Sequence, residues 1–212
     1  LRGHGNSVFA LAPFDNGQLA TGSEDHTIRV WEPSGQCAAV LRGHEAGVLA
    51  LAALDNGQLA SASWDNTIRL WDRSGQNTSM LRGHDEPVLA LAPLDNGQLA
   101  SGSADRTIRL WDSFGQSAGV FRGHDETVVV LARLGKGQLA SGSTDKTIRL
   151  WDSTGHCAAV LRGHENTIVA LVPLANGELA SGSYDTTIRL WDRSGQNTAV
   201  LREHEHSVYA LA

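Results

Sequence analysis

Serine or threonine, histidine and aspartate recur together along the chain in a fixed order. The first set is His4, Thr21 and Asp25, and an equivalent set follows every 40 residues, which gives five sets in all. These are the residue types of a nucleophilic catalytic triad, in which histidine takes the hydroxyl proton and the carboxylate orients the imidazole. A hydrolytic site needs one activated nucleophile in one cleft. The five equivalent sets are therefore interpreted as structural, and no catalytic residue is assigned.

The segments that must position these sets follow the same period of 40 residues, without insertion or deletion. Leu-Arg-Gly-His recurs at 41–44, 81–84 and 161–164, with Phe-Arg-Gly-His at 121–124. Thr-Ile-Arg-Leu-Trp-Asp recurs at 67–72, 107–112, 147–152 and 187–192. We therefore treat the chain as a single domain made of units 1–40, 41–80, 81–120, 121–160 and 161–200 and a partial unit 201–212.

Each unit reads as four short strands separated by turns. In the second unit the expected strands are 48–52, 58–63, 67–71 and 77–81, and none shows the i, i+3, i+4 apolar spacing of a helix. The Asn-Gly of Asp55-Asn56-Gly57 suits the positive φ angles of a tight hairpin. A four-stranded meander cannot bury both faces alone, but side-by-side stacking buries them. The predicted fold is all-β: a propeller of four-stranded antiparallel blades, with five full repeats plus one extra strand.

Three correlated motifs point to a family. The Gly-His pair, the Ser/Thr-x-Ser-x-Asp turn and the Trp-Asp that closes the third strand together resemble the WD-repeat β-propeller family over essentially the whole chain. Two mild departures are Glu32 after Trp31 and Glu203 before His204. The resemblance implies that His, Ser or Thr, Asp and Trp form a hydrogen-bonded structural tetrad in each blade. Carried over by motif position, the tetrads are His4, Thr21, Asp25, Trp31; His44, Ser61, Asp65, Trp71; His84, Ser101, Asp105, Trp111; His124, Ser141, Asp145, Trp151; and His164, Ser181, Asp185, Trp191.

Metal and cofactor sites have little support in the sequence, so neither is expected. Only His26, His156 and His206 lie outside the Gly-His position, and none has a partner at zinc-type spacing. The Gly-Lys-Gly at 135–137 lacks the full phosphate-loop pattern and is interpreted as a variant hairpin turn. Cys37 and Cys157 lie in different units, so we expect no disulfide, and two free thiols favour a reducing, cytoplasmic location.

Charge and hydropathy argue against two classes of partner, nucleic acid and membranes. The formal net charge is −6, from 17 Lys plus Arg against 23 Asp plus Glu. Of the basic residues, 11 occupy two repeat positions, those of Arg2 and Arg29, so little positive charge remains for a patch that would bind nucleic acid. No apolar run reaches the roughly 18 residues that cross a bilayer, and no membrane partner is expected.

The residues that flank the repeated aspartate differ from unit to unit, unlike the positions around them. In the resembled family this turn lies on the face most used for binding, around the mouth of the central channel. The resemblance therefore implies a non-catalytic scaffold that binds proteins or peptides, as a module of a larger protein. The expected partner-binding residues are Glu24, His26, Trp64, Asn66, Arg106, Thr144, Lys146 and Tyr184.

Two other functions stay open. A carbohydrate-binding, lectin-like propeller is the alternative, although it would be expected to repeat one pocket in every blade. An enzyme with a site in the channel is the third, and no singular cluster of residues supports it.

Blade number is also open, because the resembled family usually closes with about seven blades. Five units leave three outcomes: an arc from a longer ring, which we favour, a tight five-bladed ring, or closure by association with another chain. An open ring would expose apolar blade faces and favour self-association.

Overall fold

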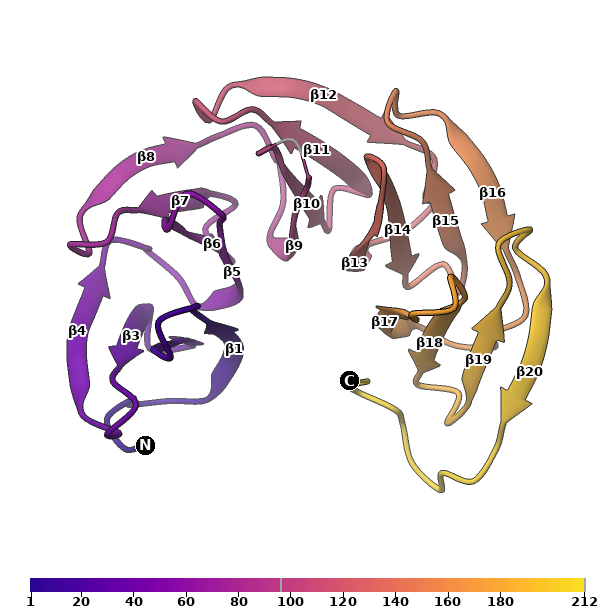
Figure 1. Cartoon of the computed structure of the whole chain (residues 1–212), viewed down its shortest axis with the longest axis horizontal. Helices are drawn as coiled ribbons and strands as arrows, with labels where there is room; N and C mark the ends of the chain where they lie inside the picture. The colour runs from indigo at the N-terminus through magenta and orange to yellow at the C-terminus, as the bar shows by residue number, and fades with distance from the viewer. Residues whose placement is uncertain (96, 212) are drawn as a thin grey trace.

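The computed structural model describes residues 1–95 and 97–211, so Asn96 and Ala212, which belong to the third and the partial units, lie outside the described residues. Every regular element in the described part is a strand, and none of its elements is a helix suited to crossing a membrane. The strands form five four-stranded antiparallel sheets, each built from four consecutive strands. We call these sheets blades one to five. They stand side by side in an arc (Figure 1), which confirms the predicted propeller architecture.

Each blade runs outward from the centre of the arc in chain order (Figure 1). The innermost strands are β1 (Val8–Pro13), β5 (Val48–Ala53), β9 (Val88–Pro93), β13 (Val128–Gly135) and β17 (Ile168–Pro173). The second strands are β2 (Leu19–Ser23), β6 (Leu59–Ser63), β10 (Leu99–Ser103), β14 (Gln138–Ser143) and β18 (Leu179–Ser183). The third strands are β3 (Thr27–Trp31), β7 (Ile68–Trp71), β11 (Thr107–Trp111), β15 (Ile148–Trp151) and β19 (Ile188–Trp191). The outer strands are β4 (Cys37–Arg42), β8 (Asn77–Leu81), β12 (Ser117–Arg122), β16 (Cys157–Leu161) and β20 (Asn197–Leu201).

The core lies between blades rather than within them. At the first junction Ala20, Ile28 and Leu41 of blade one pack against Val48 and Trp71 of blade two. The other three junctions bury clusters from equivalent positions. A Trp side chain buries about 150–250 Å², and Trp71 is only 2% exposed. Stacking of neighbouring blades therefore buries the large side chains of each unit.

Small residues on the second strands let the blades approach closely. All of β6, which reads Leu-Ala-Ser-Ala-Ser, is buried. A Cβ atom added at Gly22 of β2 would lie 2.7 Å from Cγ1 of Val48 in the next blade. This spacing brings the inner strand of each blade against the second strand of the one before, and it fixes where the loops at either end of the blades meet.

The arc is open, with blades one and five at its two ends (Figure 1). Val8 of blade one is 47% exposed, whereas Val48 and Val88 at the same position are 0% exposed. At the other end Leu201 is 45% exposed, against 3% for Leu161. The alternative of a tight five-bladed ring is therefore wrong, because no blade covers these two faces. Self-association through them stays a prediction.

Residues 202–211 do not form the strand expected for the partial sixth unit. They cross the inner part of the exposed face of blade five, where the N–H of Val208 donates to the carbonyl of Ser183 at 3.1 Å. Val208 is 6% exposed and lies over Gly182, as Val48 lies over Gly22. The segment keeps the apolar contact of an inner strand, but it has no neighbouring strand of its own with which to form a ladder.

The turn at Asp55-Asn56-Gly57 is not the tight hairpin that its Asn-Gly pair predicted. Of the pair Asn56 and Gly57, only the glycine adopts positive φ (82°), and its N–H donates to the carbonyl of Leu54 at 2.8 Å. The connection is therefore a longer turn that ends in a left-handed glycine, in which Asn56 needs no unusual φ. The tight two-residue form occurs instead at Lys136 and Gly137, where φ is 53° and 74° and Gly135 pairs with Gln138.

Candidate functional site

The structure brings the four tetrad residues of each blade together. In blade two the histidine precedes β5, the serine lies on β6, the aspartate lies in the β6–β7 turn and the tryptophan ends β7. Across the five blades the histidine Nδ1 lies 2.7–3.0 Å from the aspartate Oδ2. The histidine Nε2 lies 2.7–2.8 Å from the hydroxyl oxygen. The tryptophan Nε1–H donates to the same hydroxyl at 2.8 Å.

These contacts form a one-way chain of donors. Trp71 donates to Ser61, and with a neutral imidazole Ser61 donates to Nε2 of His44, whose Nδ1–H donates to Asp65. Ser61 is 0% exposed, and its oxygen already contacts two ring nitrogens. A substrate carbonyl cannot reach such a hydroxyl. The arrangement resembles a triad in composition, but it works as an internal brace that joins the loop before β5, the strands β6 and β7, and the turn between these two strands.

Two further hydroxyl positions belong to the same network, and neither role was predicted from the sequence. Thr67 donates from Oγ1 to Oδ1 of Asp65 at 2.6 Å, and its N–H donates to the same oxygen at 3.0 Å. Ser63 accepts the N–H of Asp65 at 3.1 Å and donates to the carbonyl of Ala46 at 3.2 Å. Equivalent residues occur in all five units, so their invariance within the repeat was a usable signal.

The network keeps the aspartates ionised. Burial alone raises the pKa of Asp65, but hydrogen bonds from His44, Thr67 and the N–H of Glu45 outweigh it and hold the pKa well below its ordinary 3.8. The pKa values of the other four tetrad aspartates are lowered in the same way. Burial also lowers the pKa of His164 below its ordinary 6.5, although the neighbouring Asp185 opposes this shift. At neutral pH the aspartates are carboxylates, and His164 is a neutral imidazole.

The eight residues expected to bind a partner all lie on the turns between the second and third strands. These turns share one end of the blades with the loops that lead into the inner strands, and we call this end the binding face. Three of the eight are half-buried: Glu24, Asn66 and Thr144. The other five are exposed: His26, Trp64, Arg106, Lys146 and Tyr184.

Two aromatic pairs on the binding face join different units, and one member of each pair, Phe9 or Tyr209, was not predicted from the sequence. The rings of Trp64 and Phe9 lie 5.4 Å apart, centroid to centroid, with an interplanar angle of 68°. The rings of Tyr184 and Tyr209 lie 5.3 Å apart. Phe9 sits at a bulge in β1 between Val8 and Ala10. Trp64 and Tyr184 nevertheless remain 42% and 40% exposed. Phe9 could have been found from the sequence, because it is aromatic at a position of the repeat where the four other full units carry Leu or Val.

Exposed carboxylates surround these aromatics. The loops between each outer strand and the next inner strand carry Glu45, Asp85, Glu86, Asp125, Glu126 and Glu165, all exposed. Against them, the variable turns contribute only Arg106 and Lys146 as exposed permanent cations. The exposed arginines of the Arg42 type lie farther out, at the ends of the outer strands. The inner part of the binding face is therefore acidic.

Comparison with known proteins fixes the family. The WD domain, G-beta repeat family matches residues 1–32, 35–72, 75–112, 115–152 and 155–192. The chain belongs to the WD40 repeat family. Each WD40 match runs from an outer strand through the third strand of the following blade, or from residue 1 in the first case. WD40 propellers are in general non-catalytic scaffolds that bind proteins or peptides.

Two solved structures illustrate the likeness. The WD40 β-propeller domain of Doa1 has a TM-score of 0.89 and 27% identity over 98% of this chain and 72% of that chain. The computationally designed Ika8 protein has a TM-score of 0.87 and 35% identity over 100% of this chain and 66% of that chain. No curated protein matches the chain.

The described part of this WD40 chain holds no group of three or more His, Cys, Asp or Glu side chains placed to bind a metal ion. Cys37 and Cys157 are both free thiols, the first exposed and the second half-buried. Neither observation tests the cytoplasmic location, which stays a prediction.

Backbone strain recurs on the binding face of the WD40 blades. The residue after each tetrad aspartate has φ of 65–70°, and these residues are His26, Asn66, Arg106, Lys146 and Thr186. Left-handed φ is unfavourable for a β-branched side chain and is better tolerated by asparagine.

We expect Thr186→Gly to raise the free energy of unfolding by about 0.5–1 kcal/mol, because glycine accepts this φ without a Cβ clash. Urea unfolding measures the change. Asn66→Gly is the matched control and should bring no gain, since Asn66 also donates to the carbonyl of Asp85 at 3.0 Å. A loss of stability in Thr186→Gly would contradict the strain.

Proposed function

We propose that the chain is a non-catalytic scaffold whose binding face captures a protein or peptide segment that combines basic and apolar residues. The observation that carries the proposal is the set of exposed carboxylates beside the exposed rings of Trp64 and Tyr184. Aromatic side chains with one free face are typical anchors of protein interfaces. Carboxylates around them attract lysine and arginine and repel acidic segments.

The turns favour a peptide over a repeated small ligand. Each blade places a different pair of residues next to the tetrad aspartate, for example Glu24 and His26 in blade one and Trp64 and Asn66 in blade two. An extended segment that crosses several blades meets a different side chain at each step. A lectin-like propeller would be expected to present the same contact in every blade.

An array of short peptides that vary in charge and in aromatic content tests the proposal. We expect the peptides bound best to carry Lys or Arg next to Leu, Phe or Trp, and their binding to weaken as salt rises. Preferential capture of acidic peptides, or of glycans on a parallel array, would contradict it.

For the best peptide we expect Trp64→Ala to weaken binding at least tenfold, because an aromatic anchor contributes about 2 kcal/mol or more. Fluorescence anisotropy with the labelled peptide measures Kd, and thermal melting checks that the fold is kept. The matched control is Phe114→Ala, which removes an 81% exposed aromatic from the β11–β12 turn at the opposite end of the blades. Equal losses in the two variants, or none in Trp64→Ala, would rule out the binding face.

A further inference from the structure

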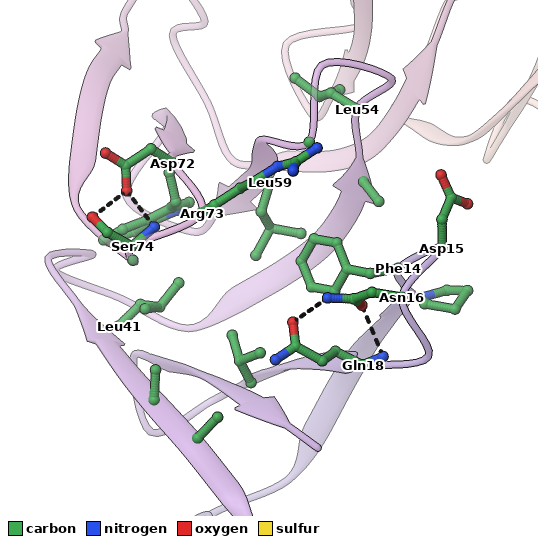
Figure 2. A pocket seen from close by; sticks show the side chains of 18 of the residues that line it. Phe14, Asp15, Asn16, Gln18, Leu41, Leu54, Leu59, Asp72, Arg73 and Ser74 are labelled. Carbon is green, nitrogen blue, oxygen red and sulfur yellow. Dashed lines mark hydrogen bonds between the residues drawn. The ribbon is translucent and has the colours of Figure 1, made fainter. Parts of the chain in front are cut away.

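A cavity of about 600 Å³ lies between blades one and two, at the end of the blades opposite the binding face. The turns β1–β2, β5–β6 and β7–β8 surround it, and β3 and β4 form one wall (Figure 2). The equivalent space between blades two and three holds only about 20 Å³. Because the same backbone framework builds both junctions, the difference must come from side chains.

The wall that blade one contributes is made of smaller residues than the same wall in blade two. Val30, Ala38 and Ala39 line the cavity, where blade two carries Leu70, Thr78 and Ser79. Leucine occupies the Val30 position in all four other blades.

The β1–β2 turn also differs from the same turn in the other units. Phe14 of the β1–β2 turn stands where the other units have leucine, and it is half-buried, as are Leu54, Leu134 and Leu174 at the same position. Its ring forms a side of the opening (Figure 2). The cavity is therefore not a feature that every junction repeats.

The interior of the cavity is apolar, and its rim is acidic. Val30, Leu41, Leu59 and Trp71 line the space between the blades together with the ring of Phe14. The charged residues on the lining are Asp15, Asp55, Asp72 and Arg73, so three carboxylates face one guanidinium.

Some of the polar groups at the rim already form hydrogen bonds within the chain. The amides of Asn16 and Gln18 bond to each other, with Asn16 Nδ2 donating to Gln18 Oε1 at 2.8 Å. One oxygen of Asp72 accepts from Ser74 within its own turn, at 2.6 Å from the hydroxyl. Asp15 and Asp55 lie on the β1–β2 and β5–β6 turns on either side of the opening. The net charge of the lining is −2, from one Arg and three Asp, and it favours a cation at the mouth.

We propose that this cavity binds a small apolar molecule that carries one positive charge, such as an arylalkyl amine. The volume lies within the range of about 300–1,000 Å³ that is typical of small-molecule sites. The apolar body lies between Val30 and Trp71, and the ammonium group lies at the rim near Asp15 and Asp55. This site is separate from the binding face and does not depend on the peptide that the face captures.

Three probes of equal length test the charge preference on the intact chain: 4-phenylbutylamine, 4-phenylbutanol and 4-phenylbutyrate. Isothermal titration measures their affinities, and a ligand of this size is expected to bind with Kd of about 1 mM. We expect the amine to bind best and the carboxylate at least about tenfold more weakly, which corresponds to about 1.4 kcal/mol. No saturable binding of the amine, or equal binding of amine and carboxylate, would overturn the proposal.

Val30→Leu tests the location. It restores the residue found in the other four blades, so the fold is kept while the cavity shrinks, and we expect amine binding to fall at least about tenfold. Val120→Leu is the matched control, because Val120 lies on β12 and is 36% exposed. The proposal fails if Val30→Leu binds the amine as tightly as the Val120→Leu variant does.

Discussion

Asp105→Ala is expected to lower the free energy of unfolding by about 3–5 kcal/mol, the largest effect of any single substitution considered for this chain. Its carboxylate accepts Nδ1–H of His84 at 2.7 Å, Oγ1–H of Thr107 at 2.6 Å and the N–H of Thr107 at 2.9 Å. It also accepts the N–H of Asp85 at 3.2 Å. Alanine leaves the donors of the buried His84 and Thr107 without a partner, and each unpaired buried donor costs about 1–3 kcal/mol. Urea unfolding followed by tryptophan fluorescence measures the loss.

Asp112→Ala provides the matched control for that experiment. Asp112 also accepts two hydrogen bonds, from the N–H groups of Phe114 at 2.9 Å and Gln116 at 2.8 Å, but both lie in an exposed turn. Water replaces the lost acceptor there, so we expect a loss of about 1 kcal/mol or less. If Asp105→Ala unfolds at the same urea concentration as Asp112→Ala, the buried tetrad does not hold the blades together.

Acidification is expected to destabilise the chain strongly below about pH 4. The five tetrad aspartates have folded-state pKa values below the ordinary 3.8, so the unfolded chain binds more protons in this range. Their contribution is fully present above the unfolded pKa and is lost as pH falls through it toward the folded pKa. Each extra proton bound on unfolding changes the free energy of unfolding by about 1.4 kcal/mol per pH unit.

His164 adds a smaller effect at higher pH. Its folded pKa is lowered from 6.5, so the unfolded chain binds the extra proton and stability begins to fall below about pH 6.5. The midpoint of urea unfolding, measured from pH 8 to pH 3, gives the profile. Asp105→Asn should make the acid limb shallower by about one proton. A midpoint that stays constant between pH 5 and pH 3 would mean that the tetrad carboxylates are not held ionised by the fold.

The repeat made the fold predictable. Strands, their order and the stacking of blades follow from apolar runs and turns that occur five times in one phase, so errors at one unit are corrected by the others. The sequence also pointed to the grouping of His44, Ser61, Asp65 and Trp71, through the family resemblance. The prediction of a tight hairpin at Asn56-Gly57 was wrong, because an Asn-Gly pair also fits a longer turn in which the glycine alone has left-handed φ.

Features that depend on contacts between units were harder to predict from the sequence. The contact between Phe9 and Trp64 joins residues 55 positions apart, and it depends on an aromatic side chain at a bulge that the other four inner strands occupy with Leu or Val. The cavity beside Val30 is a packing property, since it depends on the smaller side chains of the wall that blade one contributes. The acidic character of the binding face depends on which ends of the strands meet, and this is known only once the order of the strands within a blade is fixed.

The exposure of Val8 and Leu201 at the two ends of the arc also affects the order in which the blades unfold. Each interior blade is held by contacts on two sides, whereas blades one and five each have a single full neighbour. Stability in such a stack is the sum of nearest-neighbour terms, so loosening starts at the ends and moves inward one sheet at a time. Among the five described blades, blade three lies farthest from either end of the arc, so we expect it to open last and the stack to unfold from its ends.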